Sequence, residues 1–202
     1  LQTFREVLQN SSNPGFVEIG RRLGKKRLYR YVEKFGLTKK TGVDLPGESS
    51  GIMFDYKNFN ELEQATVAFG QGISITPIQL VRAISACVNG GKLLKPQILK
   101  EVKNSYTNDA VYKRKVKVIR QVIGKETSSK VKDALESVVC LGGGRNAYIP
   151  GYRIGGKTGT AQKAVNGTYV GGGYILSFVG IAPINDPQIV LYVAMDNPKN
   201  CI

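Results

Sequence analysis

The chain has 202 residues, 42% of them hydrophobic, so it can bury one sizeable core and is short for several domains. Its 29 Lys and Arg residues against 15 Asp and Glu residues give a formal charge of +14, which suits an anionic polymer or surface. No aromatic-interleaved basic motif is present, so we expect no nucleic-acid partner. No apolar run approaches the ~20 residues of a membrane-spanning helix, so any anchor is expected outside these residues.

The cysteines give no sign of a metal site. Cys87, Cys140 and Cys201 show no CxxC spacing, and the chain contains no His, so a zinc ion would lack most of its usual ligands. We predict no metal and expect buried thiols.

The first ninety residues have the pattern of helices joined by turns. Thr3 to Gln9, Val17 to Leu23 and Arg27 to Phe35 are the candidate helices, separated by Asn-Pro-Gly and Gly. The turn-rich stretch from Lys40 to Gly51 predicts a long surface loop.

Thr76 to Val88 carries the clearest helix signal. Thr76 is a good N-cap, Pro77 fits the first helical position, and Gln79 completes a capping box. The sequence predicts one apolar face, formed by Leu80, Val81, Ile84, Cys87 and Val88.

A second helix is predicted from Lys125 to Cys140. Its apolar residues recur at helical spacing before a glycine run at 142–144 ends the pattern. These residues are Val131, Leu135, Val138 and Val139.

The remainder of the chain has strand character. Tyr174 to Ala182 and Gln188 to Asp196 are rich in β-branched and aromatic residues, and the short link between them favours an antiparallel hairpin. Arg153 to Thr160 is expected to form a third strand, next to a glycine-rich turn at Gly171 to Gly173. The predicted fold class is α+β, with helices packed on an antiparallel sheet in one domain covering residues 1–202.

Two short motifs carry candidate chemistry. On the third strand, Lys157 supplies positive charge, the hydroxyls of Thr158 and Thr160 can donate hydrogen bonds, and Gly159 lets a substrate backbone approach closely. Far upstream, Ser11-Ser12-Asn13 presents a hydroxyl and a carboxamide at a turn before Pro-Gly. Either tripeptide alone is weak, but the two together belong to one known set.

The pair of motifs resembles the S-x-N and K-T-G motifs of penicillin-binding proteins and serine β-lactamases. The resemblance runs through almost the whole chain and is nearest to class B enzymes, in particular their sporulation-specific members. It is carried by residues 8–13, 42–48, 69–80, 155–162, 174–180 and 196–199.

This resemblance implies a D,D-transpeptidase that acts on D-alanyl-D-alanine stem peptides through an acyl-serine and is inhibited by β-lactams. It implies that Ser11 relays protons, that Asn13 binds the substrate amide, and that Lys157 sets the local field. Thr158 and Thr160 would hold the substrate carboxylate, and the Thr160 N–H would be an oxyanion donor. No cofactor is implied, because positioned serine, lysine and amide groups suffice.

The resemblance leaves the nucleophile unaccounted for. The S-x-x-K motif comes first in the family, and only ten residues precede Ser11, so we expect the acylated serine, like the closing C-terminal helix, to lie outside an incomplete domain. Ser129-Lys130-Val131-Lys132 matches the string, but Ser129 is predicted to face solvent. Lys40-Thr41-Gly42 is interpreted as a turn.

Three other functions stay open at this stage. Gly151 to Thr158 satisfies the P-loop string, but no strand precedes it and no helix opens at Lys157, as that loop requires. A non-enzymatic module that binds peptidoglycan or β-lactams, or that serves as a scaffold, fits the charge equally well. A carboxypeptidase would share every motif.

The family also implies a setting. We expect stem peptides, β-lactams and cell-wall synthesis proteins as partners. We expect the extracytoplasmic face of the bacterial membrane as the location, reached through an anchor outside this chain.

Overall fold

The structure is a computed structural model that describes residues 2–165 and 168–199. Within those ranges no helix is both long and apolar enough to cross a membrane. The elements in chain order are α1 (Phe4–Gln9), α2 (Asn13–Leu23), α3 (Lys25–Lys34), η1 (Tyr56–Asn58), α4 (Glu61–Ala68), α5 (Pro77–Val88), β1 (Lys92–Leu94), β2 (Glu101–Lys103), β3 (Ala110–Lys113), β4 (Val118–Gln121), α6 (Lys125–Leu141), η2 (Arg145–Ala147), β5 (Gly155–Val165), β6 (Thr168–Ala182) and β7 (Ile189–Asp196).

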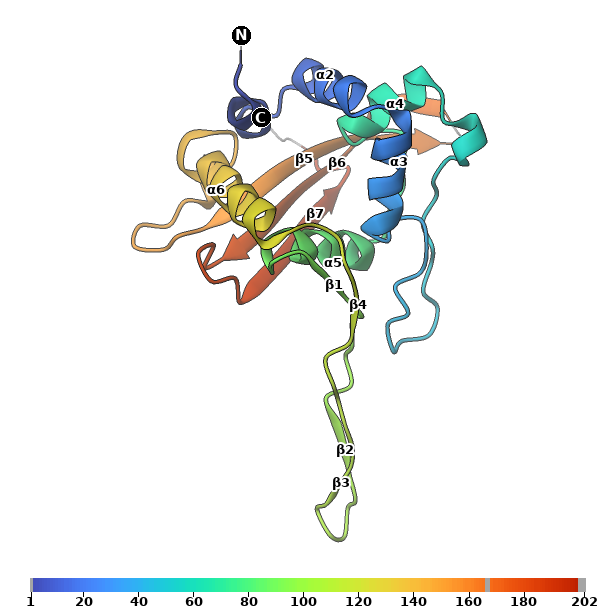
Figure 1. Cartoon of the computed structure of the whole chain (residues 1–202), viewed down its shortest axis with the longest axis vertical. Helices are drawn as coiled ribbons and strands as arrows, with labels where there is room; N and C mark the ends of the chain where they lie inside the picture. Colours follow the sequence, from blue (N-terminus) through green and yellow to red (C-terminus); the bar gives the residue numbers. More distant parts are fainter. Residues whose placement is uncertain (1, 166–167, 200–202) are drawn as a thin grey trace.

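The main sheet has the order β5-β6-β7, and both of its strand pairs are antiparallel. The short link from Ala182 to Ile189 joins β6 to β7 as a hairpin, which confirms the prediction made from its length. Figure 1 shows the three long strands crossing the body of the molecule beside α6. The α+β prediction is therefore correct.

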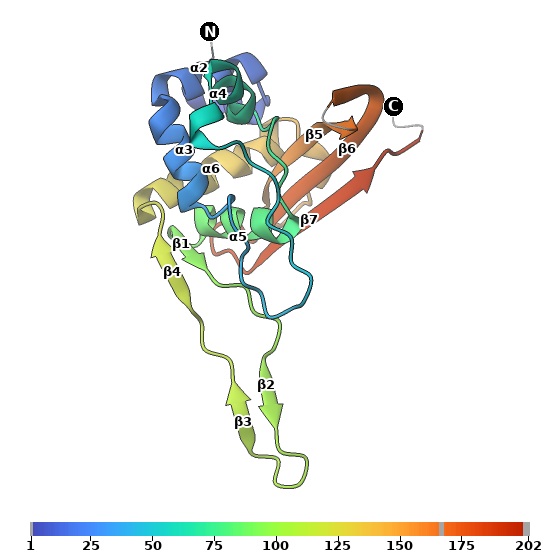
Figure 2. The same ribbon diagram turned by 90° about the vertical axis from the view of Figure 1, so that its right-hand side faces the viewer.

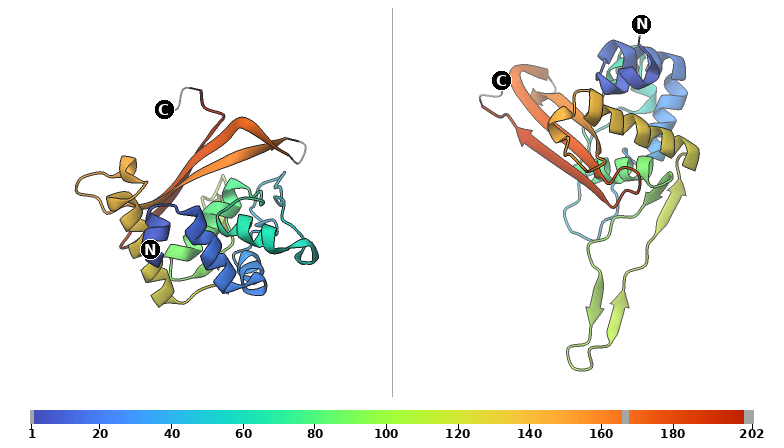
Figure 3. Two further views of the ribbon diagram at one scale, coloured as in Figure 1. Left: turned by 90° about the horizontal axis from the view of Figure 1, so that it is seen from above. Right: turned by 90° about the vertical axis from the view of Figure 1, so that its left-hand side faces the viewer.

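The helices lie on one side of this sheet, and no described helix covers the other side (Figure 3). Between sheet and helices lies a core of apolar side chains, each worth roughly 1.5–3 kcal/mol when fully buried. Its members are Leu8, Ile84, Cys87, Val88, Val131, Leu135, Ile181, Ile184 and Val190. Gly155 permits this packing, because a Cβ there would lie 2.6 Å from Cδ1 of Ile184.

Helix α5 begins as predicted and places three predicted residues, Ile84, Cys87 and Val88, in the core, but it also buries a second face. Thr76 is the N-cap and forms a reciprocal capping box with Gln79. The buried positions are Gln79, Arg82, Ala83, Ala86 and Val88, whereas Leu80 and Val81 are only partly buried. The predicted face was incomplete because α5 also packs against the loop before it, where Gln79 Nε2 donates to the carbonyls of Lys39 and Ser50.

The cysteine prediction needs one correction. Cys87 is largely buried, and burial raises the pKa of its thiol to about 11. Cys140 is exposed, because it lies near the end of α6 on the side away from the buried Val138 and Val139. Cys201 lies outside the described residues.

Two local predictions were wrong. The glycines at 171–173 lie inside β6 rather than in a turn, because β5 and β6 stay paired as far as Val165 and Thr168. Helix α2 begins at Asn13 rather than Val17, because Ser12 caps it and Pro14 is favourable in a first turn.

Residues 92–121, called the arm here, form a region for which the sequence pattern predicted no element. Strand β1 pairs with β4 and β2 with β3, both antiparallel, so the chain runs out and back as a two-stranded ribbon. Figures 1 and 2 show the arm extending far from the body. Leu93 anchors its base at 1% exposure, but residues 102–121 are all exposed.

Candidate active site

The loop between α1 and α2 places Ser11 in an unusual backbone conformation. Its φ is 52°, in the left-handed region that non-glycine residues seldom adopt. The loop is held by backbone bonds to the end of α1, with Ser11 N donating to Leu8 O at 3.3 Å and Ser12 N to Val7 O at 3.0 Å. The Ser12 hydroxyl accepts from Gly15 N at 3.4 Å and caps the N-terminus of α2. Ser12 is therefore engaged in the helix cap, whereas the Ser11 hydroxyl is not.

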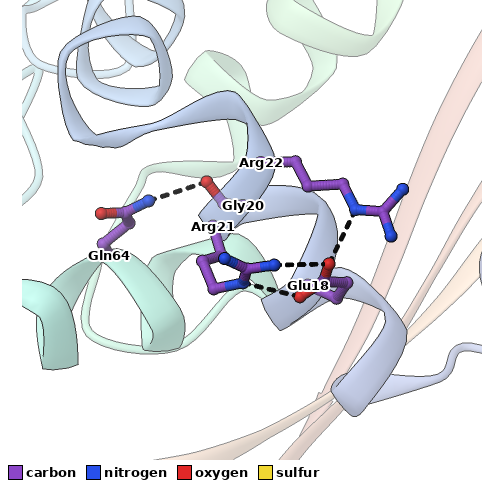
Figure 4. Close-up of polar contacts among 5 residues, drawn as sticks. All are labelled: Glu18, Gly20, Arg21, Arg22 and Gln64. Atoms are coloured by element: carbon purple, nitrogen blue, oxygen red, sulfur yellow. Dashed lines mark hydrogen bonds and ion pairs between the residues drawn. The ribbon is translucent and has the colours of Figure 1, made fainter.

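Helix α2, whose first residue is Asn13, is fixed by its packing on α4. Gln64 Nε2 donates to Gly20 O at 2.7 Å (Figure 4). A Cβ on Gly20 would lie 2.6 Å from Cβ of Ala68. The same helix carries an exposed cluster in which Glu18 binds Arg21 and Arg22. The close crossing of the helices, rather than this surface cluster, sets the position of the α2 N-terminus.

Helix α6 packs against both β5 and α1. The turn after α6 donates from Gly143 N to Gln9 O at 3.2 Å, and Gly142 lies so close to Gln9 O that no side chain fits there. An exposed ion pair of Arg153 with Glu136, 2.7 Å long, ties α6 to the chain that enters β5. The loop of Ser11 and the strand of Lys157 are thus held by a common helix.

Lys157 and Ser11 meet across this junction. The Lys157 ammonium donates to Ser11 Oγ at 2.7 Å and to Thr158 O at 3.0 Å. Lys157 has no ion-pair partner within residues 2–165 and 168–199, and burial lowers the pKa of its amine from the usual 10.5. The contact joins two positions 146 residues apart and leaves a poorly hydrated positive charge beside a hydroxyl.

The other predicted site residues lie along β5 and at the start of α2. Asn13 and Thr160 are exposed, and Thr158 is half-buried. Gly159 lies opposite Ser177 of β6, whose Oγ donates to Gly159 O at 3.4 Å. A Cβ on Gly159 would lie 2.6 Å from Ser177 Oγ. Sequence reasoning missed Ser177, because pairing it with Gly159 requires the strand register, which composition does not specify.

The sheet order leaves one edge of β5 free. Among the described strands only β6 pairs with β5, so the other edge presents unpaired backbone donors and acceptors beside Thr158 and Thr160. Such an edge can receive an extended peptide by strand addition.

The rival motifs lie elsewhere. Ser129 is exposed on α6 as predicted, and Lys132 of the same string donates to Asn185 O. Lys40-Thr41-Gly42 lies in a loop and not in a strand, although these three residues do not form the predicted turn. Lys157 and Thr158 lie inside a strand rather than at the start of a helix, which excludes a P-loop.

Two features together are typical of the transpeptidase fold of penicillin-binding proteins. One is an antiparallel sheet with helices on one side, and the other is a lysine on an edge strand that contacts a serine between two helices. The chain belongs to that family: the profile described as "Penicillin binding protein transpeptidase domain" matches residues 1–201.

Individual relatives agree with this assignment. The chain is 55% identical to stage V sporulation protein D of Bacillus subtilis, over 100% of this chain and 31% of that protein. It is 36% identical to a peptidoglycan D,D-transpeptidase FtsI homolog of Mesostigma viride, over 96% of this chain and 35% of the relative. The chain therefore spans about a third of the length of these curated relatives.

Solved structures support the fold. Penicillin-binding protein 3 of Mycobacterium tuberculosis, in complex with aztreonam, has a TM-score of 0.90 at 33% identity, covering 97% of this chain and 45% of that one. The transpeptidase domain of Burkholderia pseudomallei penicillin-binding protein 3 has a TM-score of 0.84 at 36% identity, covering 97% and 56%.

Proposed function

We propose that this chain supplies the substrate-binding half of a peptidoglycan D,D-transpeptidase, whose acylated serine lies outside these 202 residues. The observation that carries the proposal is the 2.7 Å contact from Lys157 Nζ to Ser11 Oγ, beside the free edge of β5. This contact places the hydroxyl of one motif and the ammonium of the other within hydrogen-bonding distance in one site.

The proposed reaction transfers an acyl group at D-alanyl-D-alanine. The nucleophilic serine attacks the carbonyl carbon, the C–N bond to the terminal D-alanine breaks, and Ser11 passes a proton toward the departing amine. A second stem peptide's amine then attacks the ester, releases the serine and forms the cross-link. β-Lactams enter as substrate mimics whose acyl-enzyme persists.

Substrate binding is assigned to β5 and the start of α2. The hydroxyls of Thr158 and Thr160 hold the terminal carboxylate in the positive field of Lys157, and Thr160 N–H is one oxyanion donor. Gly159 leaves room for the peptide backbone, and Asn13 hydrogen-bonds the substrate amide. The proposal is supported by the half-buried Lys157, because a charge with little water around it acts strongly on a nearby carboxylate.

We further propose that residues 1–202 form the C-terminal portion of the transpeptidase domain. The outward positions of β7, Ile189, Leu191, Val193 and Met195, are all exposed on the sheet face that no described helix covers. An apolar stripe of this kind suits burial beneath further chain.

The similarity to a sporulation protein supports a role in spore-cortex or cell-wall synthesis. We propose the extracytoplasmic face of the cell membrane as its location, with an anchor outside these residues, and cell-wall synthesis proteins as its partners.

The test is labelling with a fluorescent penicillin followed by intact-mass analysis. One sample is the 202-residue chain, the second extends upstream through a Ser-x-x-Lys segment, and the third carries Ala in place of that serine. Drug mass on the second sample alone supports the proposal. If none is labelled, the enzyme proposal fails and a non-enzymatic wall-binding or scaffold module replaces it. Release of D-alanine that requires an acceptor amine separates transpeptidase from carboxypeptidase.

A further inference from the structure

A polar cavity lies away from the Ser11–Lys157 contact, at the base of the arm. It has a volume of about 340 Å³ and lies between the end of α3, the loop after it, α5 and strands β1 and β4. Its charged lining residues are Glu33, Lys39, Lys40, Arg82 and Arg120. Four cations therefore share the cavity with one carboxylate.

Arg82 is the buried member of this group. It is 8% exposed, and its guanidinium donates to the carbonyls of Gly36 at 2.6 Å and Thr41 at 3.4 Å. Its Nε is buried and has no hydrogen-bond partner among the described residues. A buried N–H donor without a partner is something that native proteins seldom tolerate.

The charge of Arg82 is also incompletely balanced. Arg82 has no ion pair within 4.0 Å among the described residues, and Glu48, the acid that attracts it, already accepts from Thr41 and Gly42. Burial is the main cause that lowers the pKa of Arg82; Glu48 opposes it, and Arg120 lowers the pKa by a smaller amount. Two guanidinium groups thus repel each other across one cavity, and an anion between them would relieve that repulsion.

The three remaining cations are free to turn toward a ligand. Lys39, Lys40 and Arg120 are exposed, and their side chains form no ion pair or hydrogen bond within residues 2–165 and 168–199. Main-chain contacts fix the surroundings, since Lys39 O accepts from Gln79 and Leu93 is buried beside the cavity. The site therefore combines a fixed wall with exposed cationic side chains.

We propose that this cavity binds an oxyanion, a phosphate or carboxylate group held by Arg82 and Arg120 with Lys39 and Lys40 at the rim. Planar guanidinium groups and flexible ammonium groups are the side chains that proteins use for such ligands. The arm continues from the site with nine Lys and Arg residues against two acidic residues between positions 92 and 121. A polymer that carries repeated oxyanions could thus extend from the cavity along the arm.

The test uses isothermal titration calorimetry on the intact protein with three probes: inorganic phosphate, citrate and a short phosphodiester oligomer. Saturable binding of at least one probe is expected. Tighter binding of the oligomer than of phosphate identifies polymer-borne groups as the ligand, and equal binding identifies the free anion.

A matched pair of variants localises the binding. Lys39→Gln with Arg120→Gln should weaken affinity about tenfold or more, since each substitution removes a charged hydrogen-bond donor to the ligand. Lys26→Gln with Arg27→Gln removes the same charges from the other end of α3, outside the cavity lining, and should change affinity less than about twofold. All four residues are exposed, so folding is expected to be preserved.

Equal weakening in the two double variants would show only a general effect of net charge and would overturn the proposal. So would the absence of saturable binding by all three probes.

Discussion

The junction of α1, α6 and β5 and the arm at 92–121 use lysine in opposite ways. At the junction, Lys157 is half-buried, its pKa is lowered by burial, and its ammonium has a fixed acceptor in Ser11. In the arm, the cations of residues 102–121 are exposed, and so are large apolar side chains such as Tyr106 at 96%. A half-buried lysine held against a partner can act strongly on one nearby group. An exposed lysine, screened by water and salt, attracts anions without distinguishing among them.

The largest expected difference is in catalysis. Lys157→Met keeps the length of the side chain but removes its charge and donors. In the protein extended upstream through the Ser-x-x-Lys segment, acylation by penicillin should therefore slow by about 10²- to 10⁴-fold. Lys113→Met in the arm should leave the rate within about twofold, as expected for an exposed position. The second-order rate constant for fluorescent penicillin is the measurement. Equal rates in the two variants would remove the distinction between junction and arm.

Stability should separate the same two regions. Ile181 is fully buried in the core, so Ile181→Ala should lower the free energy of unfolding by about 2–5 kcal/mol. Ile98 in the arm is 61% exposed, and Ile98→Ala should change it by no more than about 0.5 kcal/mol. Urea unfolding of both variants measures the contrast. A large loss with Ile98→Ala would mean that another surface covers the arm.

The electrostatics of the junction can be tested through Ser11. Its Oγ accepts from the Lys157 ammonium and so favours the charged form, while burial opposes it. Ser11→Ala should therefore lower the pKa of Lys157 further below 10.5, and Ser12→Ala, which removes only a helix cap, should not. Titration of lysine resonances by NMR measures both. An upward shift in Ser11→Ala would contradict the hydrogen bond.

The smallest effect is expected at the surface ion pairs. The Arg153 guanidinium lowers the pKa of Glu136 below 4.5, so this pair stabilises the fold above that pH and ceases to do so as the pH falls through the lowered pKa. Arg153→Gln should reduce the melting temperature slightly at neutral pH and not in strong acid. Lys103→Gln, which removes the looser 3.8 Å arm pair with Glu101, should have no effect at either pH. Melting curves across this range decide the point.

Much of the fold could be predicted because its signals are local. A capping box at Thr76, an apolar repeat in α6 and two β-rich runs with a short link each specify an element through neighbouring residues. The arm was missed because its strands are only three or four residues long and, apart from β1 at its base, their side chains are mostly exposed, so no apolar alternation marks them. Gln79 and Arg82 were missed as buried residues because their partners lie 29 to 46 positions away.

The sequence by itself determined helices α1, α2, α3, α5 and α6, the antiparallel hairpin and the two motifs at Ser11 and Lys157, but not α4. Only the tertiary structure decided that Lys157 reaches Ser11, that Ser177 lies opposite Gly159, and that Arg82 is buried beside Arg120. Helix caps and hydrophobic periods act within a few residues, so they can be read from the chain. Strand register, close glycine contacts and the balance of buried charge depend on groups that become neighbours only on folding.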